Sequence, residues 1–93
     1  MREKELERKL VQKVKSSGGF ALKFTSPGFD GMPDRIVLLP HGKLAFVEVK
    51  RHGMKPTTLQ ASRHGMLQRL GFLVFVLNRA EQIGVIISAI QST

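Results

Sequence analysis

The chain has 93 residues, of which 42% are hydrophobic, so we expect a single domain with one modest core. It has no cysteine, which excludes disulfides and thiolate metal sites, and no apolar run approaches the ~20 residues of a membrane span. Fifteen Lys and Arg against seven Asp and Glu give a net charge of +8, which favours nucleic acid over a membrane as partner.

The first sixteen residues, MREKELERKLVQKVKS, carry a helical pattern. Leu6, Leu10 and Val14 recur at helical spacing, which predicts a helix over residues 3–16. Gly18 follows and can adopt the left-handed conformation that ends a helix. The segment is too charged for the apolar part of a signal peptide, so we expect a cytoplasmic protein.

Three short strands are predicted next. The first covers residues 20–24 and is followed by TSPGFDGM, a loop rich in glycine and proline. The second covers 34–39 and the third 44–50. Because residues 40–43 form a turn, we expect the second and third strands to pair antiparallel.

The second half adds a helix, a strand and another helix. Residues 56–58 start a helix that runs to residue 70. FLVFVL, residues 72–77, is typical of a fully buried strand. Asn78 is predicted to cap the last helix with Glu81 as its capping-box partner. The order α-β-β-β-α-β-α indicates an α/β fold, in which helices flank a mixed sheet.

Glu7 falls where a packed helix face should be apolar. It lies about 100° from Leu6, between Val14 near 80° and Val11 near 140°, and so inside the apolar arc of the helix. Because an unpaired carboxylate there would be costly, Glu7 needs an ion-pair partner, a metal or an open site. The alternative is that Glu3 and Glu7 only favour the helix N-terminus, which suits Glu3 better.

Charged residues also gather at one predicted strand end. Glu48 and Lys50 share a face of the third strand, because side chains alternate. Asp34 begins the second strand, so the antiparallel turn brings it to the same end of the sheet. An internal salt bridge of Lys50 with Glu48 or Asp34 is one explanation.

A metal site is the other explanation. Carboxylates that lie close together repel, so a divalent cation such as Mg²⁺ is their natural occupant. Such a cation activates a water molecule and neutralises charge on a phosphate. Lys50 could orient that water or stabilise charge on the phosphorus. Beside a polyanion, these groups predict hydrolysis of a phosphodiester.

Pro33-Asp34 followed, after thirteen residues, by Glu48-Val49-Lys50 resembles the PD-(D/E)xK nuclease signature. The segments SPGFDGMPDRIVLLPHGKLAFVEVK and LQASRHGMLQRLGFLVFVL resemble the VRR-NUC family over nearly the whole chain. The resemblance implies a restriction-endonuclease-like fold with one nuclease domain over residues 1–93. It also implies a DNA endonuclease that uses Mg²⁺ or Mn²⁺, in the cytoplasm of a bacterial cell or phage-infected host.

The layout is similar to that of archaeal Holliday-junction resolvases, which implies cleavage of four-way junctions by a homodimer. The apolar last-helix segment GVIISAI could supply the dimer surface or be ordinary core. A general or nicking duplex endonuclease is an alternative function, and a non-catalytic DNA-binding module is another. The module would predict a degraded motif, whereas here the motif is intact.

The resemblance also implies roles for particular residues. The family pattern matches five catalytic positions: Glu7, Asp34, Glu48, Lys50 and Gln60. The implied metal ligands are Asp34, Glu48, Glu7 and the carbonyl of Val49. Gln60 lies at the rim of a helix face with Leu59, Met66, Leu67 and Leu70, so a solvated position is equally open.

Basic residues near the predicted site are candidates for phosphate contacts, which position nucleic acid without reading its sequence. They are Lys23, Arg35, Arg51, Lys55 and Arg63. Arg35 alternates to the face opposite Asp34, where it could instead pair on the far side or meet the backbone. The three histidines, His41, His52 and His64, lack metal-ligand spacing, and we assign them to the surface.

Overall fold

A computed structural model describes all 93 residues. The elements follow one another in the predicted order, and the strand bounds lie within one residue of those predicted. They are α1 (Glu3–Ser16), β1 (Phe20–Lys23), β2 (Arg35–Leu39), β3 (Lys43–Val49), α2 (Thr58–Arg69), β4 (Leu73–Leu77) and α3 (Gln82–Gln91). None of the helices is both long and apolar enough to cross a membrane.

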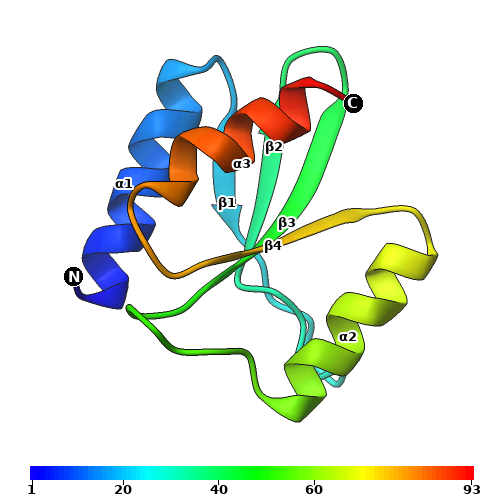
Figure 1. Cartoon of the computed structure of the whole chain (residues 1–93). Helices are drawn as coiled ribbons and strands as arrows, with labels where there is room; N and C mark the ends of the chain where they lie inside the picture. The colour runs from blue at the N-terminus through cyan, green and yellow to red at the C-terminus, as the bar shows by residue number, and fades with distance from the viewer.

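The four strands form one mixed sheet in the order β1-β2-β3-β4 (Figure 1). The pairs β1–β2 and β2–β3 are antiparallel, whereas β4 returns after α2 and pairs parallel to β3. Gly18, with φ of +91°, ends α1 as predicted. A Cβ on Gly19 would lie 1.9 Å from the Leu38 carbonyl oxygen, so only glycine lets the chain enter β1 this close to β2.

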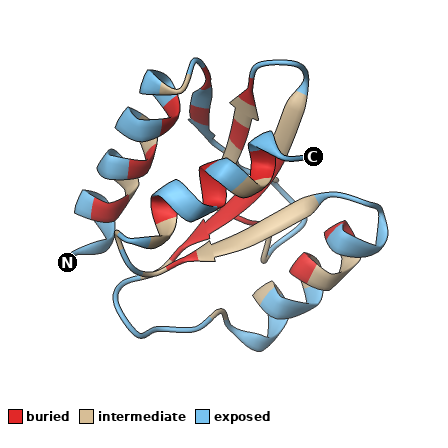
Figure 2. Ribbon diagram, turned by 45° about the horizontal axis from the view of Figure 1, so that its top comes forward, coloured by how far each residue is buried: buried red, intermediate tan, exposed pale blue.

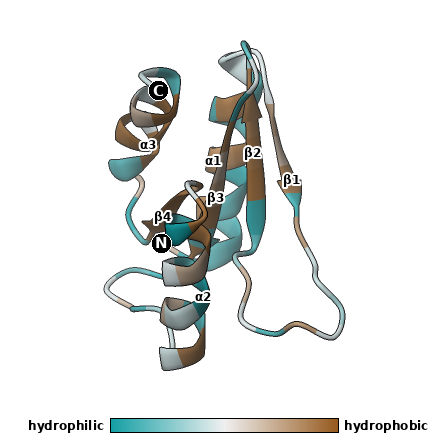
Figure 3. Cartoon of the chain, turned by 90° about the vertical axis from the view of Figure 1, so that its right-hand side faces the viewer, coloured by the Kyte–Doolittle hydropathy of each residue, from teal (hydrophilic) through white to brown (hydrophobic).

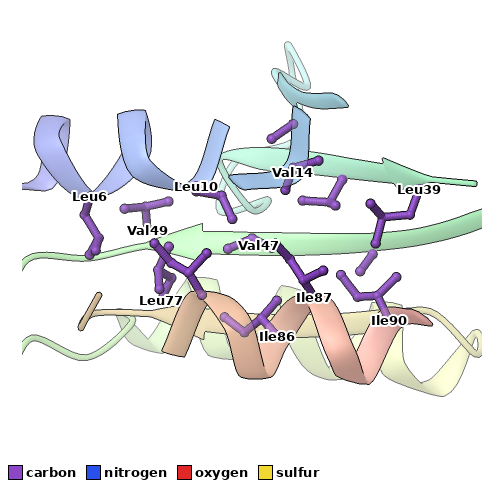
Figure 4. Packing of buried hydrophobic residues seen from close by; sticks show 14 residues of the cluster. Leu6, Leu10, Val14, Leu39, Val47, Val49, Leu77, Ile86, Ile87 and Ile90 are labelled. Atoms are coloured by element: carbon purple, nitrogen blue, oxygen red, sulfur yellow. The ribbon is translucent and has the colours of Figure 1, made fainter. Parts of the chain in front are cut away.

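The core lies between one face of the sheet and the two helices α1 and α3 (Figure 2). Leu10 of α1, Val47 of β3 and Ile87 of α3 meet in this layer (Figure 4). Four isoleucines of α3 are buried there: Ile83, Ile86, Ile87 and Ile90. The apolar segment GVIISAI is therefore mainly core, and of its large side chains only Val85 is exposed.

Two local predictions were wrong. The strand β4 is only half-buried apart from Leu77, because it is the edge strand of the sheet. The last helix begins at Gln82, and Glu81 makes no side-chain cap. The Gln82 side-chain oxygen instead accepts hydrogen bonds from the backbone N–H groups of Asn78, at 2.8 Å, and Arg79, at 3.1 Å.

Candidate active site

Asp34 and Glu48 lie opposite each other at one end of the sheet. Arg35 pairs with Val47 in the antiparallel β2–β3 register. One residue beyond this pair, the same register places Asp34 opposite Glu48. The Val49 N–H donates to Asp34 Oδ2 at 2.9 Å, which holds this carboxylate against the end of β3. The predicted convergence of Asp34 with Glu48 is thus present, and Glu48 is only 1% exposed.

The helix α1 adds carboxylates from the other side of Asp34. Oxygens of Glu3, Glu7 and Asp34 all lie within 4.8 Å of one another. Glu7 points inward because its neighbours Leu6 and Leu10 are buried in the core. Glu3, for which a role at the helix N-terminus was the better-fitting alternative, therefore belongs to the same acidic group.

Glu7 has a partner from β2. Arg35 Nη2 lies 3.2 Å from Glu7 Oε2, and Arg35 Nη1 donates to the Ala21 carbonyl at 3.3 Å. Both contacts agree with the sequence-based alternative in which Arg35 points to the face opposite Asp34 and pairs there instead of binding phosphate. Arg35 lies between α1 and the sheet, so its geometry favours the internal ion pair over the phosphate contact predicted for it.

The helix α2 brings Gln60 to Glu48 through its N-terminal cap. The Thr57 hydroxyl accepts from the Gln60 N–H at 3.2 Å, and the Gln60 side-chain oxygen accepts from the Thr57 N–H at 2.9 Å. This reciprocal capping box fixes the Gln60 side chain. Its remaining group, Nε2, lies 3.4 Å from Glu48 Oε2. Gln60 therefore faces the carboxylate pair and is not a solvated rim residue.

The assignment of His64 to the surface was wrong. His64 is 7% exposed, and its Nε2 lies 3.4 Å from Glu48 Oε1. The predicted packed face of α2 was also misplaced, because Leu70 is 73% exposed and Leu59 is exposed too. His64 follows Gln60 by four residues, so both lie on one face of the helix. That spacing is the signal that could have found it.

Burial and the neighbouring carboxylate change the protonation of Glu48. Burial raises the pKa of Glu48 to about 8, and a hydrogen bond with Asp34 and the Asp34 charge act in the same direction. Lys50, whose Nζ lies 3.9 Å from Glu48 Oε2, opposes the rise. Burial, followed by the Lys50 charge, lowers the pKa of His64, so its ring is neutral at pH 7.

These donors fit a hard divalent cation. The acidic group joins oxygens of Glu3 and Glu7 to Asp34, which also contacts Glu48 of β3, and Mg²⁺ and Mn²⁺ prefer oxygen ligands. The raised pKa of Glu48 reflects its burial first and the neighbouring Asp34 carboxylate second. A bound cation would relieve the repulsion between the two carboxylates.

Comparisons with known proteins show which family the chain belongs to. No family model matches the chain. A protein of Acyrthosiphon pisum secondary endosymbiont phage 1, described as "Putative nuclease p44", is 50% identical over 78 residues, which is 84% of each chain. A solved structure described as "VRR_NUC domain" superposes with a TM-score of 0.87 and 31% identity, over 92% of this chain and 94% of that one. The chain belongs to the VRR-NUC family.

The predicted VRR-NUC resemblance and fold are thus confirmed, and the protein is a nuclease of this type. Three of the residues predicted to contact phosphate are exposed. Lys23 ends β1, while Arg51 and Lys55 lie in the segment between β3 and α2, directly after Lys50.

The remaining candidate, Arg63, is engaged within the protein. Its Nε donates to the Asp30 carbonyl at 2.8 Å, and its guanidinium lies 3.9 Å from the centre of the Phe29 ring. Gly31 in the same loop lies so close to α2 that a Cβ would come 2.8 Å from Leu59 Cγ. Arg63 therefore holds the loop before Asp34 on α2, a role that sequence reasoning missed.

Proposed function

We propose that this VRR-NUC nuclease hydrolyses phosphodiester bonds of DNA with Mg²⁺ or Mn²⁺ at Asp34, Glu48, Glu7 and the carbonyl of Val49. The observation that carries the proposal is the nearly inaccessible Glu48 beside Asp34: burial, and next the Asp34 carboxylate, raise the pKa of Glu48 to about 8. A divalent cation, when bound, supplies an activated water and neutralises charge on the phosphate.

The surrounding residues hold these groups in place. Arg35 fixes Glu7 through their ion pair, and the Val49 N–H fixes Asp34. Gln60 contacts Glu48 from the cap of α2. Lys50 lies two residues after Glu48 on the same face, where its ammonium group would stabilise charge that develops on the phosphate.

The basic charge favours DNA as the substrate. A net charge of +8 attracts a polyanion and speeds its encounter with the protein. Lys23, Arg51 and Lys55 are exposed at or next to the strand ends that carry the acidic residues, so we assign phosphate contacts to them. The place of action is the cytoplasm of a bacterial cell or phage-infected host, and residues 1–93 act as one nuclease domain.

A homodimer would form through the open face of the sheet. No helix covers β1 and β2 on the side opposite α3 (Figure 3). Phe20 is 61% and Leu22 48% exposed there, and the register places Ile36 beside Leu22 on the same face. Two residues further along, the same face reaches Asp34 and Glu48. A second copy packed on this apolar face, with the two-fold axis along the strands, would place both sites at the same end of the dimer, as paired nicks in a four-way junction require.

Cleavage of a labelled four-way junction and of its matched linear duplex tests the proposal, with Mg²⁺, Mn²⁺ or EDTA and with Asp34→Asn beside the wild type. We expect paired, cation-dependent cuts in the junction that the variant does not make. Equal cutting of both DNAs would keep the nuclease and replace junction resolution by general duplex cleavage. Binding without cutting under either cation would overturn the enzyme and favour the DNA-binding module.

A further inference from the structure

The helix α2 offers two side chains, one turn apart, to the same carboxylate. Gln60 Nε2 lies 3.4 Å from Glu48 Oε2, and His64 Nε2 lies 3.4 Å from Glu48 Oε1. The two oxygens of Glu48 therefore have separate partners from one helix face. The capping box holds Gln60 in this place, whereas His64 lies deeper and is nearly inaccessible.

The chemistry of the pair defines what His64 can do. A neutral imidazole has one N–H donor and one acceptor nitrogen, whereas an ionised carboxylate only accepts. The Nε2 of His64 therefore carries the proton when it faces ionised Glu48. Each carboxylate oxygen has two lone pairs, so one hydrogen bond to each oxygen leaves a lone pair on each for a cation.

We infer that His64 is a positioning residue, which donates to Glu48 Oε1 and orients this carboxylate for the divalent cation. The inference rests on the proposed function. A glutamate side chain rotates about three bonds, and donors on both oxygens restrict this rotation before the cation arrives. Partners that orient a metal ligand typically change metal affinity by about 10–100-fold when they are removed.

Packing alone does not account for a histidine in this place. Leu67 is the other buried residue of α2, and an aliphatic side chain could fill the position of His64. A buried polar ring is costly unless it has a hydrogen-bond partner, and Glu48 is the partner that His64 has. The choice of histidine is therefore explained by the carboxylate it contacts.

The test compares variants with and without the donor. His64→Gln keeps an N–H near the position of Nε2, while His64→Leu and His64→Phe fill the space without a donor. Leu67→Met is the matched control, because it changes a buried side chain on the same helix that makes no hydrogen bond to Glu48. Mn²⁺ affinity is measured by titration calorimetry on metal-free protein, at a temperature where circular dichroism shows each variant folded.

We expect the two donor-free variants to bind Mn²⁺ about tenfold or more weakly. His64→Gln and Leu67→Met should stay within about threefold of the wild type. Wild-type affinity in a donor-free variant that is folded would overturn the inference, as would equal weakening in His64→Gln.

The proposed function fails separately from this inference. If the wild type binds no Mn²⁺, or if Asp34→Asn binds it equally well, there is no cation site at Asp34, and the proposed function falls with the inference. If the wild type binds Mn²⁺ through Asp34 and the donor-free variants bind it as tightly, only the role of His64 is overturned.

Discussion

The two faces of the sheet are built differently. The face toward α1 and α3 is closed by aliphatic side chains such as Leu10, Val47 and Ile87, which form one continuous core. The face toward α2 carries Phe46 and then, two residues along the same strand, Glu48. Consecutive residues of β3 thus serve opposite purposes, because side chains alternate across the sheet.

The difference explains how so small a chain can hold charges in its interior. The closed face supplies the burial that stabilises the fold, so the α2 face can carry groups that contribute little to stability. The core side chains of α3 are isoleucines, which cannot hydrogen-bond to Glu48, whereas α2 contacts it through Gln60 and His64. We therefore expect changes on the two faces to separate stability from activity.

The largest effect on stability is expected from the closed face. Leu10→Ala removes a fully buried side chain and should lower the free energy of unfolding by about 2–5 kcal/mol. Urea denaturation measures this, and cleavage per folded molecule should stay near the wild-type rate. A stable Leu10→Ala protein with lost cleavage would show that the two faces are not independent.

Glu48→Gln should have the opposite effect to Leu10→Ala: stability is kept and cleavage is lost. The amide keeps the shape of Glu48 and cannot ionise in this buried place, so the melting temperature should hold or rise. Cleavage should fall by about 10²-fold or more, because the site loses a carboxylate ligand. Thermal melts and junction cleavage on the same preparations check both statements, and near-wild-type cleavage would remove Glu48 from the chemistry.

The pH dependence of the metal-free protein sharpens the comparison. The folded-state pKa of Glu48 is raised from 4.5 to about 8, so the folded state binds more protons and stability falls as pH rises through this range. The lowered pKa of His64 acts only below its ordinary value of 6.5. Between pH 6.5 and pH 8, Glu48 alone should therefore reduce stability by about 1–2 kcal/mol. Urea denaturation at several pH values in EDTA measures this fall, and saturating Mn²⁺ should abolish it. A free energy of unfolding that does not change with pH in EDTA would contradict the raised pKa of Glu48.

The smallest effect on the fold is expected at the open sheet face. Phe20→Ser changes an exposed side chain, so the monomer should keep its stability within about 0.5 kcal/mol. The proposed dimer should dissociate, which light scattering measures, and paired cuts should become single nicks. Val85→Ser is the matched control, because Val85 is 70% exposed on α3, on the other face. Dimers that survive Phe20→Ser would move the interface elsewhere.

The sheet end of the site was predictable from sequence because it depends on local rules. The turn at residues 40–43 sets the register, and the register brings Asp34 to Glu48. Glu7 was found because it interrupts the apolar stripe of α1. Segments with strong periodicity therefore predict the fold, and they also reveal the charged residues that interrupt its apolar faces.

The residues that α2 contributes to the site could not be predicted in the same way. The buried residues of α2 are His64 and Leu67, so the apolar periodicity that marks a packed face is absent. The prediction placed Leu59 and Leu70 on the packed face, but both are exposed. The partner of Arg63 lies in a loop 33 residues earlier, a tertiary contact with no periodic signal. Helix faces that pack on a polar site are thus the part that sequence patterns predict least well.

The proton released when Mn²⁺ binds tests the central claim most directly. Calorimetric titrations at pH 7 in buffers of different ionisation enthalpy measure it. Because metal-free Glu48 has a pKa of about 8 and a ligand must be deprotonated, the wild type should release about one proton per cation. Glu48→Gln should release none. Binding without proton release in the wild type, or equal release in the variant, would contradict a cation site built on Glu48.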